Sequence, residues 1–404
     1  MSNAKKIVIV SHSHICRNPR VLKEAITLAT EGNQVTVLTA IYSDKLLTED
    51  LELIVNEGFN YEFYSDLRTS NTGTFVARLV RKIATKLQSG LHIESVLSLG
   101  YNSAKLWKRA IAHKADLYIM HQELPTCLGI KLIDRGYNVA FDLEDWYSED
   151  LLPYARKNRP VKLLKKAESD ALRRGIYCVT TSRALSDRLA TKYSAKPPGV
   201  IYNVFPSPAQ LPEKIKMNRP LKLFWFSQTI GPGRGLEGFI SLLASVEYSL
   251  ELHLLGNVAP DYQHNLKAMM PSNHQLFFHD LVNEKELAAK IATFDIGLAL
   301  ELQSPPNRNY TITNKFFQYL QAELPIIASE TEGQNEGFEK FKPGFKISQI
   351  PDTKEIAKLN NWLNDLPAME IARQQAVKSA AYYNWENESK KLITLVEKAF
   401  EPAG

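Results

Sequence analysis

Residues 221–226 (LKLFWF) and 227–237 (SQTIGPGRGLE) decide the fold. The first segment is an apolar run of strand length, and the second is a glycine-rich turn that leads into a helical pattern. A polar stretch with several prolines precedes them, and similar strand–helix units occur on both sides of that stretch. The sequence therefore predicts an α/β protein with two Rossmann-like, doubly wound domains.

We expect a first domain at residues 1–206, a linker at 207–219, a second domain at 220–380 and an amphipathic C-terminal segment at 381–404. Asn18 is expected to cap the first helix, with Pro19 at its first position. The expected strands are 6–10, 34–38, 117–120, 139–143, 177–181, 200–204, 221–226, 250–255, 275–278, 296–300 and 325–328. Ligands should bind where the carboxyl ends of these strands face a cleft between the domains.

The amino-acid composition indicates a folded globular protein and argues against disulfide-rich and membrane-spanning classes. The chain has 404 residues, of which 44% are hydrophobic and 23% charged, with a net charge of +5; this balance is typical of a folded globular protein. Three cysteines without CxxC spacing form neither a disulfide framework nor a zinc site, which favours a cytoplasmic location. No apolar run reaches the roughly 18–20 residues of a membrane-spanning helix.

Common catalytic motifs are absent from the sequence. The turn after residues 6–10 contains no glycine, which argues against a nicotinamide or flavin dinucleotide. The sequence has no GxxxxGK[ST], HExxH or GxSxG motif. Asp142 and Glu144 have the spacing of an acidic metal-binding pair, but a single such pair is a weak signal. We expect no metal site and no bound cofactor.

Two segments of the second domain predict a phosphate-binding site. Gly233 and Arg234 lie in the glycine-rich turn, where backbone amides, a helix N-terminus and a guanidinium would together bind an anion. Lys315 lies in the first turn of a later helix capped by Thr311 or Thr313, and a cation there is unfavourable unless an anion shares the site. The alternatives are an ordinary turn and a solvated lysine.

Several motifs in order resemble a known family. They are NPRV from Asn18, TSR from Thr181, IYNV from Ile201, NKFFQYL from Asn314 and LPIIAS from Leu324. In this order and at these intervals they resemble the retaining GT-B glycosyltransferases of the group 1, family 4-like type, which use nucleotide-diphosphate sugars as co-substrates. The resemblance implies sugar transfer to a glycan or lipid-linked acceptor in cell-surface polysaccharide synthesis, without metal, and a C-terminal helix that crosses back to the first domain.

The same resemblance, together with the predicted phosphate site, assigns donor-binding residues. They are Ser227, Gln228, Gly233, Arg234, Asp280, Leu281, Thr311, Ile312, Thr313, Asn314, Lys315 and Gln318. The family's acidic pair falls here on Tyr310 and Gln318, and neither is a carboxylate. Gln318 would still hydrogen-bond a hydroxyl. This departure leaves open a catalytically inactive nucleotide-sugar or glycan-binding subunit, and a GT-B nucleotide-sugar epimerase is a further alternative.

Two expected strands of the first domain end in polar clusters. The resemblance places His121, or else Glu123, beneath the donor sugar, and the alternative for His121 is a structural histidine. Glu144 and Asp145 would bind or deprotonate the acceptor hydroxyl, or else cap the following helix. The remaining candidates for the acceptor side are His12, His14, Arg20 and Trp146.

Basic segments of the first domain predict an anionic partner surface. Phe75, Leu79, Ile83 and Leu87 repeat at helical spacing among basic residues, and Lys105, Lys108, Arg109 and Lys114 follow. Either this helix docks on an anionic membrane leaflet, or its apolar stripe faces the core. We expect a cytoplasmic protein that is peripheral on the inner face of the plasma membrane, with no nucleic-acid partner.

Overall fold

The computed structural model describes residues 4–208, 210–212 and 217–401. Its contacts divide the chain into unit 1, Met1–Ile201 with Ser389–Gly404, and unit 2, Tyr202–Glu388. The chain therefore passes between units at residues 201/202 and 388/389, rather than at the expected boundaries 206, 219 and 380. Each unit is described by itself below.

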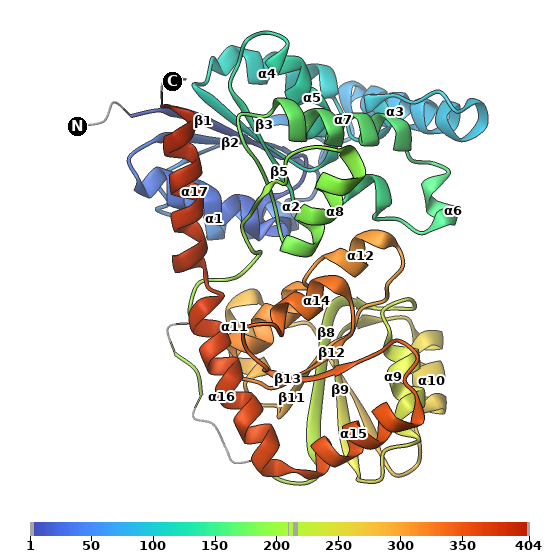
Figure 1. The fold of residues 1–404 in the computed structure, drawn as a ribbon. Coiled ribbons are helices and arrows are strands. Elements are labelled where there is room, and N and C mark those ends of the chain that lie inside the picture. Colours follow the sequence, from blue (N-terminus) through green and yellow to red (C-terminus); the bar gives the residue numbers. More distant parts are fainter. Residues whose placement is uncertain (1–3, 209, 213–216, 402–404) are drawn as a thin grey trace. The chain divides into compact units, whose positions relative to one another are not determined.

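Unit 1 contains a seven-stranded parallel sheet in the order β3-β2-β1-β4-β5-β6-β7 (Figure 1). The strands are β1 (Lys6–Val10), β2 (Gln34–Ile41), β3 (Asn60–Asp66), β4 (Leu117–His121), β5 (Val139–Leu143), β6 (Cys178–Thr180) and β7 (Gly199–Val200). The central strands β4 and β5 are buried along their whole length. Strands covered on both faces read as continuous apolar runs, and this explains why the sequence predicts them.

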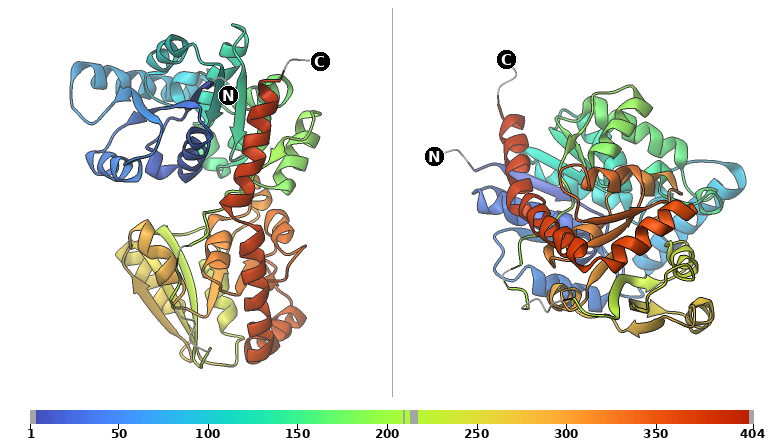
Figure 2. Two further views of the ribbon diagram at one scale, coloured as in Figure 1. Left: turned by 90° about the vertical axis from the view of Figure 1, so that its left-hand side faces the viewer. Right: turned by 60° about the horizontal axis from the view of Figure 1, so that its bottom comes forward.

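Helices cover both faces of this sheet (Figures 1 and 2). They are α1 (Pro19–Thr30), α2 (Asp44–Leu53), α3 (Thr72–Leu91), α4 (Ser103–His113), α5 (Glu123–Ile133), α6 (Pro153–Arg156), α7 (Val161–Arg174) and α8 (Arg183–Tyr193), with short 3₁₀ helices η1 (Ile15–Arg17), η2 (Val96–Ser98) and η3 (Tyr147–Glu149). As predicted, the Asn18 side chain accepts a hydrogen bond from the amide of Val21, and Pro19 begins α1. The last helix, α17 (Trp385–Ala399), contributes its residues from Ser389 onward to unit 1.

Helix α3 exposes its large apolar side chains. Phe75 is 67% exposed, and Leu79, Ile83 and Leu87 are also exposed, whereas the small residues Ala77 and Ala84 are buried. The helix lies at the periphery of unit 1 (Figures 1 and 2). The alternative that this stripe faces the core is therefore wrong, because the small residues form the face that packs inward.

Unit 2 contains a six-stranded parallel sheet in the order β10-β9-β8-β11-β12-β13. The strands are β8 (Leu221–Ile230), β9 (Leu250–Val258), β10 (Gln275–His279), β11 (Ile296–Ala299), β12 (Ile326–Ser329) and β13 (Gly344–Ile347). The helices are α9 (Leu236–Leu243), α10 (Pro260–Met269), α11 (Glu284–Ile291), α12 (Pro306–Tyr310), α13 (Asn314–Gln321), α14 (Glu332–Gly337), α15 (Thr353–Asn364) and α16 (Leu366–Tyr382).

Tyr319 anchors α13 to the middle of this sheet. Its hydroxyl lies 3.0 Å from the carbonyl oxygen of Phe224 on β8 and 3.2 Å from that of Leu298 on β11. A Cβ on Gly297 would lie 2.2 Å from the Tyr319 ring, so a glycine is required where the ring crosses β11. This packing fixes the start of α13 beside the carboxyl ends of β8 and β11.

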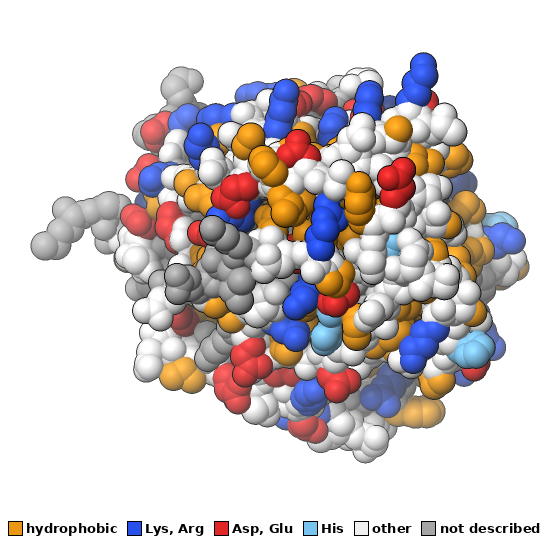
Figure 3. Space-filling model, turned by 90° about the horizontal axis from the view of Figure 1, so that it is seen from below, with side chains coloured by type: hydrophobic (Ala, Val, Ile, Leu, Met, Phe, Trp, Pro, Cys, Tyr) orange, Lys and Arg blue, Asp and Glu red, His pale blue; other side chains and the backbone are white. Residues whose placement is uncertain are grey.

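The surface of the protein gives two further facts. Among the described residues, no helix is both long enough and apolar enough to span a membrane. On the face drawn in Figure 3, basic and acidic side chains are interspersed with small groups of hydrophobic ones. The charge of helix α3 differs from the mixed charge of that face, because α3 contains four basic residues and no acidic residue.

Candidate functional site

Strand order locates one ligand-binding edge in each unit. In unit 2 the order of the strands reverses between β8 and β11, and in unit 1 it reverses between β1 and β4. Loops that follow such strands diverge to opposite faces and leave a crevice at the carboxyl edge. Most of the candidate residues follow β1, β4, β5, β8 or β11 or lie at the start of α13, so they belong to these two edges.

The turn after β8 begins later than predicted. Strand β8 continues to Ile230 after a register shift against β9, so Ser227 and Gln228 lie in the strand and not in the turn. Gly233 and Gly235 have φ values of 75° and 80°, which favour glycine, and Gly235 caps α9. The glycine-rich turn is therefore the segment from Gly231 to Gly235, with Arg234 between the two glycines of positive φ.

Lys315 lies at the start of α13 and beside this turn. Its Nζ atom is 3.7 Å from Oε1 of Glu301 and 5.3 Å from the centre of the Trp225 ring. Burial lowers the pKa of Lys315; Glu301 opposes that shift, and the charges of Arg234 and Arg308 add to it. The two predicted cations, Arg234 and Lys315, are thus close enough to interact within unit 2.

Arg308 and Glu301 belong to the same group but were not predicted. Arg308 lies on the short helix α12 and donates a hydrogen bond through Nη1 to the carbonyl oxygen of Gly233. Burial lowers its pKa, and the neighbouring charge of Arg234 contributes. Arg308 is not part of a sequence motif, so nothing in the sequence indicated it as a site residue. Glu301 directly follows the predicted strand 296–300, and that position could have indicated it as a site residue.

The remaining donor-side candidates surround the start of α13. Thr313 is the N-cap, and its Oγ1 accepts a hydrogen bond from the amide of Lys315 at 3.1 Å. The Ile312 side chain is buried, so only its backbone is available to a ligand. Thr311 is the C-cap of α12. Tyr310 and Gln318 are half-buried, whereas Asn314 is exposed, as are Asp280 and Leu281 after β10.

Gln122 has a strained backbone at the carboxyl end of β4. Its φ of 67° and ψ of 175° lie in a region that residues other than glycine rarely adopt and that is concentrated at functional sites. Its Oε1 accepts hydrogen bonds from the Ser11 hydroxyl at 2.8 Å and from the His12 amide at 3.0 Å. Gln122 therefore connects the loop after β1 to the loop after β4, and it was not among the predicted site residues.

Glu123 forms an ion-pair cluster with two of its neighbours. Arg159 donates a hydrogen bond to its Oε1, and Nε2 of His12 lies 3.5 Å from its Oε2. Burial acts to raise the pKa of Glu123, but His12 and Arg159 outweigh it and lower that pKa. Burial also raises the pKa of the adjacent Asp150 to about 7. Glu123 is thus an ionised carboxylate at the edge of unit 1.

His121 is buried and bridges two carboxylates. Its Nδ1 is 2.9 Å from Oε1 of Glu144, and its Nε2 is 3.1 Å from Oε2 of Glu24. The side chain has no exposed surface, so in this conformation it reaches no ligand. The expectation that His121 lies against the sugar is corrected accordingly: both ring nitrogens are engaged by protein carboxylates.

Three acceptor-side candidates are also buried. His14 binds Asp50 through Nδ1 at 2.6 Å and accepts a hydrogen bond from the Tyr42 amide at Nε2. Arg20 donates to Asp142, and Trp146 is 2% exposed. These side chains support the fold of unit 1 and offer no open surface to an acceptor, whereas His12 and Asp145 remain accessible.

Glu144 does not cap a helix. The residue before η3 is Trp146, which makes no side-chain capping bond, and Glu144 instead accepts hydrogen bonds from His121 and from Nδ2 of Asn18. The capping alternative is therefore wrong for Glu144, and its half-buried carboxylate stays at the carboxyl edge.

A cluster with metal-ligand chemistry lies behind this edge. One ligand atom each from Glu24, His121 and Asp142 lies within 4.8 Å of the others, and all three residues are buried. Nε of Arg20 donates to Asp142 at 2.5 Å, so cationic groups of the protein already balance these carboxylates. Arg20, Glu24, His121 and Asp142 thus form a buried network of charged groups.

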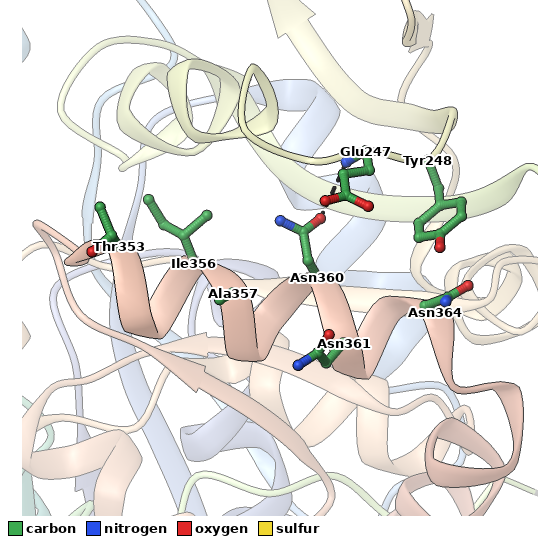
Figure 4. Close-up of a pocket in the computed structure, with 8 residues that line it drawn as sticks. All are labelled: Glu247, Tyr248, Thr353, Ile356, Ala357, Asn360, Asn361 and Asn364. Carbon is green, nitrogen blue, oxygen red and sulfur yellow. Dashed lines mark hydrogen bonds between the residues drawn. The ribbon is translucent and has the colours of Figure 1, made fainter.

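One pocket of unit 2 lies away from both edges (Figure 4). It has a volume of about 210 Å³ and is lined by α15 and by the loop before β9, including Glu247, Tyr248 and Asn360. Asn360 accepts a hydrogen bond from the Glu247 amide and donates one to the Ser245 carbonyl. The pocket lies at the amino ends of the strands, and the side-chain amide of Asn360 is engaged by backbone groups. We therefore do not propose this pocket as a ligand-binding site.

Comparisons with known proteins address the fold. No family model matches the chain, and no curated protein sequence matches it. HepE of Anabaena, solved with UDP-glucose, matches with 14% identity and a TM-score of 0.66 over 97% of this chain and 99% of its own. Sucrose-phosphate synthase of Thermosynechococcus elongatus matches with 12% identity and a TM-score of 0.67 over 98% and 99%.

The chain has the GT-B fold. The predicted fold class and the family resemblance are thus confirmed at the level of the fold. The GT-B likeness extends to a putative UDP-N-acetylglucosamine 2-epimerase of Listeria monocytogenes, with 11% identity and a TM-score of 0.57 over 99% of this chain and 97% of that one. The activity has to be argued from the residues at the two edges.

Proposed function

We propose that the protein is a glycosyltransferase that binds a nucleotide-diphosphate sugar at the carboxyl edge of unit 2. The grouping of Arg234, Arg308 and Lys315 at the switch point carries this proposal. Three cations with one neighbouring carboxylate, Glu301, complement a diphosphate, and the amides at the start of α13 add to the attraction. Structural neighbours solved with UDP and UDP-glucose support uridine nucleotides as the first ligands to test.

The chemistry follows from the position of these charges. When the bond between the anomeric carbon and the phosphate oxygen breaks, Arg234, Arg308 and Lys315 stabilise the departing diphosphate. The acceptor oxygen forms the new bond to the anomeric carbon, on the face that the diphosphate leaves, and its proton goes to Glu144 or Asp145. We infer that these cations replace a metal, so activity should survive treatment with EDTA.

Calorimetry tests the donor site. Wild type, Arg308→Ala and Lys315→Ala are titrated with UDP and with UMP, followed by a panel of other nucleotide diphosphates and their sugars. Each variant should lose about tenfold or more in affinity for UDP, because a charge-assisted phosphate contact contributes roughly 1.5–3 kcal/mol, and lose less for UMP. Lys354→Ala, an exposed lysine on α15, is the control. Equal affinity of all variants for UDP would refute the assignment of the site.

Product analysis separates transfer from the two alternatives. A transferase releases the nucleotide diphosphate and attaches the sugar to an acceptor, whereas an epimerase changes the sugar configuration without an acceptor. An inactive subunit binds the donor and releases nothing, and Tyr310 and Gln318 at the family's acidic positions keep that outcome in the comparison. Binding without turnover, across a panel of glycan and lipid-linked acceptors, would contradict the proposed transfer.

We also propose that the acceptor is lipid-linked and that α3 docks on an anionic membrane. Phe75, Leu79 and Ile83 expose apolar surface on a helix whose charges are Arg78, Arg81, Lys82 and Lys86. Exposed apolar patches mark interaction surfaces, and a basic amphipathic helix suits the headgroup layer of anionic lipid. The exposed lysines of α4 extend the positive surface of unit 1.

Co-sedimentation with vesicles tests this surface. The wild type should co-sediment with vesicles that contain acidic lipid and dissociate from them at high salt. It should not co-sediment with zwitterionic vesicles. Lys82→Glu with Lys86→Glu should abolish binding. Lys354→Glu with Lys358→Glu makes the same change at the same spacing on α15 and should not. Equal loss in both double variants would show a general charge effect and contradict docking through α3.

A further inference from the structure

Glu144 is the accessible end of a buried chain of charged groups in unit 1. Its Oε1 accepts a hydrogen bond from Asn18 Nδ2 at 2.8 Å and lies 2.9 Å from His121 Nδ1. The Glu144 side chain is 16% exposed, whereas that of His121 is not exposed at all. Because β4 and β5 are neighbours, their carboxyl ends place these two residues at the same edge.

The charged groups on the far side of His121 from Glu144 are also fixed by hydrogen bonds. Glu24 of α1 contacts His121 Nε2 at 3.1 Å, and Arg20 of the same helix donates Nε to Asp142 at 2.5 Å and Nη1 to the Ile201 carbonyl at 2.8 Å. None of these side chains is more than 1% exposed. Buried charges carry a desolvation cost that apolar residues of similar volume would avoid. A network of this kind is therefore a candidate for holding a functional group in position.

The protonation states suit that role. Burial disfavours the charged form of His121, but Glu24, Glu144 and Asp142 outweigh it and raise its pKa to about 10. Both ring nitrogens then carry protons and donate, one to Glu24 and one to Glu144. Burial raises the pKa of Asp142 to about 7, with Arg20 opposing and Glu24 adding to the shift.

Two further titratable groups face the network. Burial raises the pKa of the Tyr177 hydroxyl and of the Cys178 thiol, and the charge of Asp142 adds to both shifts. Both groups are therefore neutral at physiological pH. The charges that act on His121 are those of Glu24, Glu144 and Asp142.

We propose that His121 is a positioning residue for Glu144, which it holds in one orientation at the carboxyl edge of unit 1 through Nδ1. This inference rests on the proposed function, because it assigns Glu144 to the acceptor hydroxyl. His121 itself touches no substrate. Glu24 fixes the far side of the imidazole, so the carboxylate of Glu144 is anchored through α1 and does not depend on the loop after β5 alone.

Two variants separate the two sides of the imidazole. An asparagine amide reaches the place of Nδ1, and a glutamine amide reaches that of Nε2. His121→Asn should therefore keep the bond to Glu144, and His121→Gln should keep the bond to Glu24. We expect kcat to fall by about 10- to 100-fold in His121→Gln, against 100-fold or more when a general base itself is lost, with little change in the donor KM. His121→Asn should retain most of kcat.

A double-mutant cycle identifies the route of the effect. If His121 acts through Glu144, His121→Gln should cost little further activity in a Glu144→Gln background. The control is His113→Gln, which alters a histidine of α4 that is paired with Glu62 of β3. Additive losses, or equal losses in His121→Asn and His121→Gln that follow their melting temperatures, would overturn the positioning role.

A spectroscopic readout keeps this inference distinct from the proposed function. ¹⁵N NMR of the imidazole, assigned by the signal lost in His121→Gln, should show both nitrogens protonated at pH 7. If the protein transfers no sugar but this signal is present, the proposed function fails while the charged bridge stands. If transfer occurs and the ring is neutral at pH 7, the inference fails and the function stands.

Discussion

At the residue scale, partners far apart in sequence decide which polar residues can reach a ligand. His14, Arg20 and His121 lie at or after strands where a ligand edge is expected. Their position, and for His121 also the family resemblance, predicted them as site residues. Their partners Asp50, Asp142 and Glu24 are 36, 122 and 97 residues away. Hydrophobic periodicity contains no information about such pairs, so burial of these side chains could not be predicted.

The phosphate-binding residues were more predictable. Glycines, a capping threonine and a lysine in a first helical turn are local features, and the sequence therefore indicated Arg234 and Lys315. Arg308 was missed because a short helix with no motif brings it to the Gly233 carbonyl. Local chemistry predicts part of a site, and tertiary contacts supply the rest.

Strain at Gln122 gives a prediction at this scale. Gln122→Ala and Gln122→Gly lose the same side-chain hydrogen bonds, so their difference reports the backbone alone. The observed φ and ψ cost a residue with a Cβ about 1–3 kcal/mol, and this exceeds the roughly 0.5–1 kcal/mol by which glycine is usually worse than alanine. Chemical denaturation should find the glycine variant more stable. A more stable alanine variant would mean that the backbone at this position is not strained.

At the element scale, the inner strands could be predicted from the sequence because they are buried on both faces. β1 and β5 match their predicted bounds because continuous apolar runs mark them. The edge strands β3 and β13 were missed, since NYEFYSD and GFKI are half-polar and only partly buried. β8 was cut short at Phe226 because its last residues include the polar Ser227, Gln228 and Thr229, which pair with β9 only after a register shift.

The charged bridge between α1, β4 and β5 predicts a pH dependence of stability. The pKa of His121 is raised to about 10 in the folded protein, against about 6.5 in an unfolded chain. A raised histidine pKa stabilises the fold fully below the unfolded value, and this stabilisation is lost as the pH rises towards 10. The melting temperature of wild type should therefore exceed that of His121→Gln most at pH 6.5 and least at pH 10.

Differential scanning calorimetry at matched ionic strength measures that difference. Burial raises the pKa of Asp142, and the charge of His121 opposes that shift. Asp142 would therefore ionise at a higher pH in His121→Gln than in wild type and would add its own pH dependence to the comparison. Both proteins are therefore compared in an Asp142→Asn background, which removes this contribution and leaves Glu24 and Glu144 on the two sides of the ring. A gap between the two melting temperatures that stays constant from pH 6.5 to pH 10 would show that His121 carries no proton-linked stabilisation.

At the scale of the whole molecule, the chain completes unit 1 only after it has built unit 2. Residues from Ser389 onward return to unit 1, where Leu395 lies against Gly199 and Lys5 lies over the Phe400 ring at 5.0 Å. Leu392 and Val396 of α17 are 1% and 4% exposed. The stability of unit 1 therefore depends on the end of the chain, although its sheet is complete by residue 200.

Leu392→Ala tests this dependence. Removing a buried leucine side chain costs about 2–5 kcal/mol, so the calorimetric transition of unit 1 should move to lower temperature by several degrees. UDP binds to unit 2 in our proposal, so the UDP-stabilised transition should keep its position, and Lys398→Ala on the exposed side of α17 should change neither. If both transitions shifted together, the two units would unfold as one body. An unchanged unit 1 would mean that α17 adds nothing to its core.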